Sequence, residues 1–476
     1  MNELPWILVA VLVVACVVLY ARGRRAGSAA TGDTLLTEQG QDGAQSFHSK
    51  LLNRTETARQ KGGSVCLLVV GLDQYALICD AFGRAEAERQ IARTMERLPS
   101  LAGKVEQVSR VGDGEIAVLV SGGAGVGSPL AGRLQTQLVE PDADAATGVA
   151  HSYSLGIAVF PEHGGAEVLL DHALLAMRSV RAGGGGGFCL YDPQMSVALR
   201  EQAQLVNDLR KAIQHGELML YYQPKIDAES LQVTAAEALL RWNHPQRGFV
   251  SPAVFVPLAE QHDLMGELGR WVIEEACREA DRWREGGLRM RVAVNISGAQ
   301  MRDDGLVDHI LTTLAQRKLP PERFTCEITE SVAMEDTQRT RQAFERMRAA
   351  HLHVSIDDFG TGYSSLAALR KLPAAELKID RAFVQDLESS DDARSIAMSI
   401  IQMAKALNLR VVAEGVETAG QRDWLVRMGC DELQGFLFSM PVPPDDLSRM
   451  ASAGILWGGA GFRESLFKPT DLQTLR

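Results

Sequence analysis

One repeated pattern fills residues 205 to about 452: a short apolar segment, a polar side chain at its end, and then an amphipathic stretch with helical periodicity. The eight apolar segments read LMLYYQPKI, TAAEALLRW, RMRVAVNIS, RFTCEITE, LHVSIDDFG, ELKIDR, RVVAEGVE and DELQGFLFSM. Helical stretches separate them, among them 265–284, 332–350 and 393–407. Eight strands alternating with helices over roughly 250 residues are typical of a barrel. We therefore predict an α/β fold with a TIM-like (β/α)8 barrel in this region.

Carboxylates and amides collect at the ends of these predicted strands. In a parallel barrel the carboxyl ends of all strands meet on one face. We therefore expect a single rim to hold Glu237, Asn295, Glu327, Glu330, Asp357, Asp358, Lys378, Asp380, Glu414, Glu417 and Gln434. Any one of these acids could be an ordinary surface charge, but their recurrence at equivalent strand ends favours a shared site. For Glu330, Asp380 and Glu417, a role in orienting loops or ligands is an equal alternative.

So many carboxylates on one rim predict a metal site. Their mutual repulsion and burial would raise their pKa values, and divalent cations relieve that repulsion. Ligands that offer only oxygen favour Mg²⁺ or Mn²⁺ over Zn²⁺. The adjacent Asp357 and Asp358 suit two ions, the first residue bridging both and the second binding one. Two neighbouring ions of this kind support the hydrolysis of phosphoesters.

Several intact motifs in this region resemble the EAL domain, the family of cyclic-di-GMP phosphodiesterases. The signature is EALLRW, with Glu237-Ala238-Leu239 at its start. The further matches are QP at 223–224, VNIS, EITES, DDFGTGYSSL at 357–366, LKID, VAEGVET and QGF. The resemblance covers residues 205–452 and implies hydrolysis of cyclic-di-GMP to linear 5′-pGpG. It also implies an EAL homodimer.

The resemblance also implies a role for each rim residue. One metal ion would be held by Glu237, Asn295, Glu327 and Asp357, and the second by Asp357, Asp358 and Glu414. Lys378 would help to position the attacking water, so that Glu237, Asp358, Lys378 and Glu414 form the catalytic set. Gln223, Arg241 and Gln434 would contact the dinucleotide. The loop 358–366 would couple substrate binding, metal binding and dimerisation, with Glu330, Asp380 and Glu417 stabilising loops.

A receptor that binds cyclic-di-GMP without cleaving it, and signals through protein contacts, is the alternative function. Such a receptor can lose metal ligands or Lys378 freely, whereas this chain retains them all. Completeness of the site therefore favours the enzyme.

Residues 61–192 predict a smaller α/β domain that resembles a degenerate GGDEF domain, the diguanylate cyclase fold. The matches are SLGIAVFP at 154–161, VVGLDQY at 69–75 and the hairpin RVGDGEIAVLV. The signature itself reads GDGEI at 112–116, and Gly71 stands where the family has a metal-binding aspartate. Cys79 replaces a guanine-binding asparagine, and 103–106 lack the inhibitory RxxD. We therefore expect no cyclase activity, and a structural or dimerisation role in preference to nucleotide sensing.

The N-terminus is expected to anchor the chain in a membrane. The run from Leu4 to Tyr20 carries no charge and is at the short end of what spans a bilayer. Arginines at 22, 24 and 25 follow it, so the positive-inside rule puts the remaining chain in the cytoplasm. We predict a single transmembrane helix at 4–21 in a bacterial inner membrane, a juxtamembrane linker at 22–60 with a short helix near 47–60, and a polar tail at 456–476.

The charge balance argues against binding of long nucleic acids. The chain has 60 Asp and Glu against 49 Lys and Arg, a formal net charge of −11. Such a surface has no general attraction for DNA or RNA, although it does not exclude a small anion held by metal. The seven cysteines are scattered without a CxxC, which argues against a disulfide framework and a cysteine zinc site.

Overall fold

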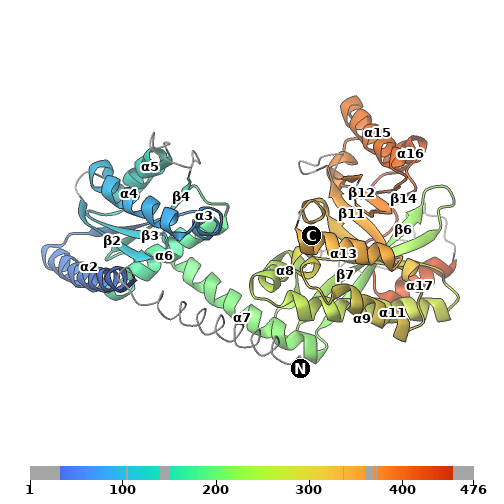
Figure 1. Cartoon of the computed structure of the whole chain (residues 1–476), viewed down its shortest axis with the longest axis horizontal. Helices are drawn as coiled ribbons and strands as arrows, with labels where there is room; N and C mark the ends of the chain where they lie inside the picture. Colours follow the sequence, from blue (N-terminus) through green and yellow to red (C-terminus); the bar gives the residue numbers. More distant parts are fainter. Residues whose placement is uncertain are drawn as a thin grey trace, which may run out of the picture. The chain divides into compact units, whose positions relative to one another are not determined.

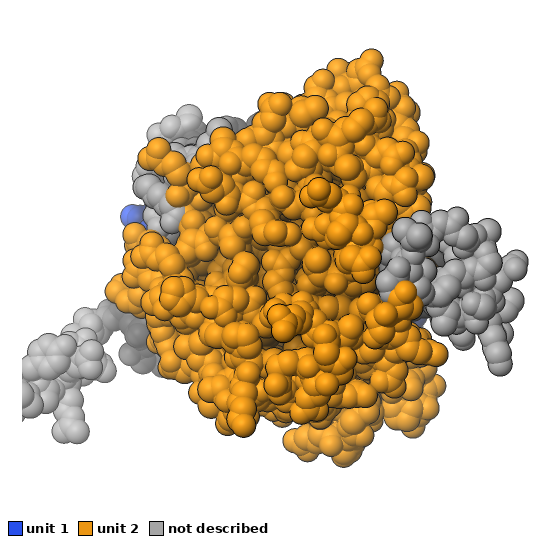
Figure 2. Space-filling model, turned by 90° about the vertical axis from the view of Figure 1, so that its right-hand side faces the viewer, with its two compact units in different colours: residues 1–201 blue, residues 202–476 orange. Residues whose placement is uncertain are grey.

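The computed structural model describes residues 33–102, 105–139, 151–335, 337–360, 369–370 and 372–453. The chain divides into two compact units, residues 1–201 and 202–476, drawn in separate colours in Figure 2. The predicted transmembrane segment 4–21 and the predicted tail 456–476 lie outside the described residues. Among the helices that are described, none has the length and apolar character needed to cross a membrane.

The first unit is a five-stranded sheet covered by helices on both faces (Figure 1). Its elements are α2 (Asp33–Lys61), β1 (Val65–Leu72), α3 (Tyr75–Phe82), α4 (Arg84–Ala102), β2 (Val105–Gly112), β3 (Glu115–Ser121), α5 (Ala124–Val139), β4 (Tyr153–Phe160), α6 (Ala166–Ala182) and β5 (Phe188–Leu190). The strand order is β2-β3-β1-β4-β5. The central strand β1 is buried throughout because its side chains alternate between two cores, one under α4 and α5 and the other under α2 and α6.

The helix α2 corrects the predicted linker over 22–60. It begins at Asp33, well before the expected short helix, and continues to Lys61. Phe47 and Leu51 lie one helical turn apart and are each 1% exposed in the core beside β1. This part of the segment therefore belongs to the first unit, because its spaced apolar residues cover one face of the sheet.

The second unit is an eight-stranded barrel, so the predicted barrel is confirmed. Its elements are α7 (Pro193–His215), β6 (Leu218–Asp227), β7 (Val233–His244), β8 (Gly248–Val250), α8 (Pro252–Gln261), α9 (Met265–Glu285), β9 (Arg291–Asn295), α10 (Gly298–Met301), α11 (Leu306–Gln316), η1 (Pro321–Arg323), β10 (Phe324–Thr329), α12 (Glu330–Ala333), α13 (Gln338–Ala349), β11 (His353–Phe359), β12 (Glu376–Ile379), η2 (Arg381–Phe383), α15 (Asp391–Ala406), β13 (Arg410–Ala413), α16 (Ala419–Met428), β14 (Glu432–Leu433) and α17 (Pro444–Ala453). The sheet order β6-β14-β13-β12-β11-β10-β9-β7 closes through β6–β7 pairing, and β8 extends β7.

One barrel strand runs against the others, which corrects the expectation of an all-parallel barrel. The strand β6 is antiparallel to both of its neighbours, β7 and β14. The reason is local: only 228–232 separate β6 from β7, whereas a parallel crossover needs about a dozen residues or more. The remaining barrel strands pair in parallel from β7 round to β14, so their carboxyl ends do share one rim.

Two predicted boundaries also change. The helix expected over 332–350 is two helices, α12 and α13, because Thr337 caps α13 by accepting a hydrogen bond from the Thr340 amide. The helix α7 crosses the predicted domain edges at 192 and 205, and Leu205, Val206 and Leu209 are buried with residues of the second unit.

Candidate active site at the rim of the barrel

The structure brings most of the predicted rim residues together. Glu237 lies on β7, Glu327 on β10, and Lys378 on β12, while Glu414 directly follows β13 and Gln434 directly follows β14. A pocket of about 340 Å³ opens here, and eight predicted residues line it: Gln223, Glu237, Asp357, Asp358, Lys378, Glu414, Glu417 and Gln434. Arg381 and Phe436, which had not been predicted, line it as well.

Glu237 is held from two sides by amide groups. The Asn295 side chain donates to its Oε1 at 2.8 Å, and Gln434 donates to its Oε2 at 2.7 Å. Gln434 also donates to Gln223 Oε1 at 3.0 Å, which ties the antiparallel strand β6 into the rim. Burial would raise the pKa of Glu237, but the ammonium groups of Lys378 and Lys225 together with these amides lower it to about 2. Glu237 is therefore a fixed, ionised carboxylate.

Lys378 is the cationic centre of the cluster. Its Nζ lies 2.5 Å from Glu414 Oε1, 3.0 Å from Asp357 Oδ2 and 3.3 Å from Glu327 Oε2, and 3.6 Å from a Glu237 oxygen. Burial opposes its charge, yet these carboxylates raise the pKa of Lys378 well above its usual range. One buried ammonium therefore faces four carboxylates, more than it could balance if all four were ionised.

A local break in β11 turns two adjacent aspartates toward the same site. Side chains at consecutive strand positions ordinarily point to opposite faces. Between Ile356 and Phe359 the register against β12 shifts, and Asp358 has a φ of 55° in the left-handed region. Such a bulge re-aims a side chain. As a result, one ligand atom each of Asp357, Asp358 and Glu414 lie within 4.8 Å of one another.

The donors fit hard divalent cations. Asp357, Asp358 and Glu414 offer carboxylate oxygens, which are the ligands that Mg²⁺ or Mn²⁺ prefers. Two buried oxygens of rim residues, Glu327 Oε2 beside Lys378 and Gln434 Oε1, have no hydrogen-bond partner among the described residues. Burial and neighbouring carboxylates raise the pKa of Glu327 to about 7, and burial raises that of Glu414 to about 8. A cation would relieve both groups.

The remaining predicted residues lie around this cluster. Glu330 is buried and accepts a 2.8 Å hydrogen bond from the Gly360 amide, at the start of the loop 358–366. Residues 361–366 of that loop lie outside the described residues. Asp380 caps η2 through the Ala382 amide at 2.8 Å, and Glu417 lies 3.4 Å from Arg381. Arg241 donates to the Leu240 carbonyl and lies over the Tyr221 ring.

Sequence reasoning missed a second charged layer inside the barrel. Lys225 of β6 and Glu376 of β12 are each 1% exposed, and Lys225 contacts both Glu376 and Glu327. A lysine within an otherwise apolar strand was the available signal, since such a group is almost never buried without a partner.

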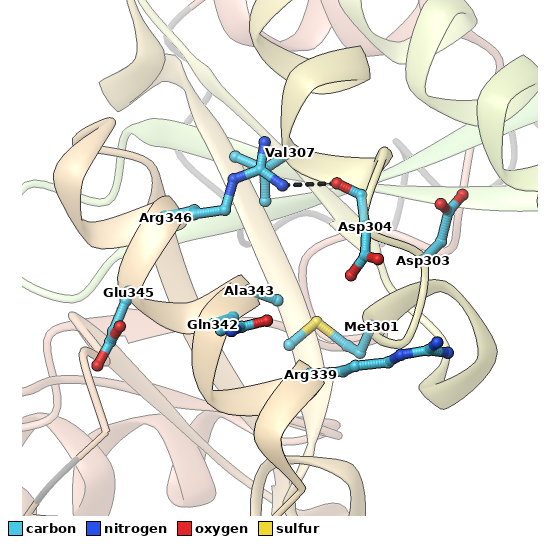
Figure 3. A pocket seen from close by; sticks show the side chains of 9 residues that line it. All are labelled: Met301, Asp303, Asp304, Val307, Arg339, Gln342, Ala343, Glu345 and Arg346. Atoms are coloured by element: carbon cyan, nitrogen blue, oxygen red, sulfur yellow. Dashed lines mark hydrogen bonds between the residues drawn. The ribbon is translucent and has the colours of Figure 1, made fainter. Parts of the chain in front are cut away.

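A second pocket, of about 280 Å³, lies between α13 and residues 301–307 (Figure 3). It contains none of the predicted rim residues, and Arg346 in its wall donates a hydrogen bond to the Asp304 carbonyl oxygen.

In the first unit, an arginine occupies the space beside Gly71. A Cβ atom at Gly71 would overlap the Arg181 guanidinium and the Met177 sulfur. Arg181 lies 3.5 Å from Asp73 and 4.0 Å from Glu115. Asp73 also accepts hydrogen bonds from Ser152, Ser154 and the Gly186 amide. Asp73 and Glu115, the acids at this end of β1, therefore already have ion-pair and hydrogen-bond partners within the chain.

Known families match both units. The EAL domain matches residues 206–441, and the diguanylate cyclase GGDEF domain matches residues 43–186. The Pseudomonas aeruginosa protein named bifunctional diguanylate cyclase/cyclic di-GMP phosphodiesterase MucR is 38% identical over 80% of this chain and 56% of its own length. The Escherichia coli cyclic di-GMP phosphodiesterase PdeR is 35% identical over 80% of this chain and 58% of its own. This chain thus spans a little over half of these two relatives.

Solved structures agree with these matches. The PaMucR phosphodiesterase, solved as a c-di-GMP complex, is 45% identical and has a TM-score of 0.50, over 51% of this chain and 99% of that one. The EAL enzyme Bd1971 in its cGMP-bound form is 26% identical with a TM-score of 0.52, over 74% of this chain and 86% of that one. The chain therefore belongs to the family of proteins in which a GGDEF domain precedes an EAL domain.

Proposed function

We propose that the barrel hydrolyses cyclic-di-GMP to linear 5′-pGpG with Mg²⁺ or Mn²⁺. The observation that carries this proposal is the cluster of four carboxylates around Lys378, joined by Asp358 through the bulge in β11. The names of MucR and PdeR, and the c-di-GMP complex of the PaMucR phosphodiesterase, support the same substrate.

The residues divide into holders of metal and holders of substrate. Glu237, Asn295, Glu327, Asp357, Asp358 and Glu414 would hold the metal ions. Bound metal would supply charge stabilisation to the phosphodiester and lower the pKa of water. Lys378 keeps its proton and orients the carboxylates around it, and it would help to position the attacking water. Gln223 and Gln434 form one hydrogen-bonded pair at the pocket wall, and with Arg241 they would contact the dinucleotide.

The decisive experiment measures product formation by the purified chain. Cyclic-di-GMP is incubated with Mg²⁺, with Mn²⁺ or with EDTA, and the nucleotides are resolved by chromatography. We expect pGpG with either metal and none in EDTA. Glu237→Ala should abolish turnover through metal loss, while the exposed Glu285→Ala should not. Binding of cyclic-di-GMP without pGpG would establish the receptor alternative instead.

We further propose a membrane-anchored homodimer with the EAL and GGDEF domains in the cytoplasm. The uncharged run at 4–21 and the arginines after it support the anchor. The dimer follows from the family resemblance of the loop 358–366. Membrane fractionation tests the anchor, and sedimentation of the detergent-solubilised chain tests the dimer. The net charge of −11 argues against DNA and RNA as partners.

A further inference from the structure

The lysine on β6 that faces into the barrel holds a carboxylate of the active site. Lys225 is 1% exposed, and its Nζ lies 2.6 Å from Glu327 Oε1 and 3.0 Å from Glu376 Oε1. An ammonium buried this deeply is stable only where carboxylates compensate it. The position of Nζ between these two oxygens is therefore fixed by both partners.

Glu327 is consequently divided between two environments. Its Oε1 accepts the Lys225 hydrogen bond from the barrel interior. Its Oε2 lies 3.3 Å from Lys378, on the side of the acidic cluster, and has no hydrogen-bond partner among the described residues. With one oxygen fixed, rotation of the carboxylate is restricted, and the other oxygen stays directed at the cluster.

The support of Lys225 extends through the barrel to its opposite end. Glu376 lies 3.6 Å from Arg291, and Arg291 makes two hydrogen bonds to Glu432, at 2.6 and 2.8 Å. Glu432 also accepts from Arg410 at 2.9 Å. These groups alternate in sign along the interior, so each charge is held between opposite ones. Arg291 keeps Glu432 if Glu376 is removed, which allows the Lys225–Glu376 pair to be changed on its own.

We propose that Lys225 is a positioning residue that holds Glu327 in the orientation needed to bind metal. The inference rests on the metal site of the proposed function. It assigns to β6, the antiparallel strand, a part in metal affinity through the second layer of groups behind the ligands.

The test measures the affinity of the full chain for Mn²⁺ by electron paramagnetic resonance, with no substrate present. The double variant K225M/E376L removes both charges of the pair, and K225Q/E376Q does so while keeping side-chain volume and hydrogen-bonding capacity. E376Q is the matched control because it retains the Lys225–Glu327 contact. We expect K225M/E376L to bind Mn²⁺ about 10–100-fold more weakly than wild type, and E376Q to bind as wild type does. Thermal melting identifies which double variants are folded.

Wild-type Mn²⁺ affinity in folded K225M/E376L, which cannot donate a hydrogen bond to Glu327, would overturn the role of Lys225, because the lysine would then only balance Glu376. Equal weakening in E376Q would also overturn it, since that variant keeps the hydrogen bond to Glu327. If the wild-type chain binds no Mn²⁺, the metal site of the proposed function fails, and this inference falls with it.

Discussion

Lys378 shows how one residue can determine the charge state of a whole site. Four carboxylates lie within 3.6 Å of its ammonium, and it is 1% exposed. We expect Lys378→Met to lower kcat by about 10²-fold, the usual cost when a reacting group is no longer held in position. Chromatographic rates of pGpG formation measure this. The exposed Lys211→Met is the control, and an unchanged kcat in Lys378→Met would contradict the assignment.

The raised pKa values of two acids predict how metal-free stability depends on pH. Glu327 and Glu414 have pKa values of about 7 and about 8, against about 4.3 when unfolded. Between the unfolded pKa and these folded pKa values, the folded chain binds more protons than the unfolded chain, so the free energy of unfolding falls as pH rises. In EDTA we expect a lower melting temperature near pH 8.5 than near pH 6. Glu237, with a pKa of about 2, stays ionised throughout and adds no slope.

Saturating Mg²⁺ should remove most of that difference, because the metal binds the ionised carboxylates. Differential scanning calorimetry at the two pH values, with and without Mg²⁺, measures both effects. A loss of about 1 kcal/mol corresponds to about 2–4 °C in a domain of this size. A barrel transition in EDTA that is insensitive to pH would show that these acids are not protonated in the fold.

At the scale of elements, the packing of α2 on the first unit is open to a matched comparison. Leu51 is 1% exposed in the core beside β1, and its neighbour Leu52 is 44% exposed. Leu51→Ala should destabilise the first unit by about 2–5 kcal/mol, and Leu52→Ala by about 0.5 kcal/mol or less. Chemical unfolding of the full chain, resolved into the transitions of its two units, measures the change in unfolding free energy for each variant. Equal effects would mean that α2 does not pack as described.

The elements also show what the sequence could and could not predict. The parallel strands and their rim were predictable, because each strand ends in a polar residue at an equivalent place. The antiparallel direction of β6 was predictable from the short 228–232 connection to β7. The expected alternation of strands and helices led to a parallel β6 instead. The bulge at Asp357 and Asp358 and the pairing of Lys225 with Glu376 depend on contacts between distant strands, which no local pattern carries.

At the scale of the whole molecule, the two units should differ in activity. With GTP and Mg²⁺ we expect no cyclic-di-GMP from the full chain, since Arg181 and Met177 occupy the space beside Gly71. Gly71→Asp alone should not restore synthesis, because the new side chain would meet the Arg181 guanidinium. Synthesis by the parent chain and by Gly71→Asp is followed by chromatography in a Glu237→Ala background, in which we expect no hydrolysis. Cyclic-di-GMP made by the parent chain would contradict the degenerate assignment.

The closing of the barrel by β6 has a consequence for how the protein is made. The strand β6 at 218–227 can pair with β14 only after residues 432–433 have been synthesised, and Tyr222 can bridge to Val442 only later still. A chain synthesised from its N-terminus meets this long-range pairing last, and such contacts form slowly. The hydrogen bonds from Gln434 to Glu237 and Gln223 also form only then. A nascent or truncated chain therefore carries two open sheet edges and an incomplete rim, which makes it a target for chaperones and proteases rather than a partly working enzyme.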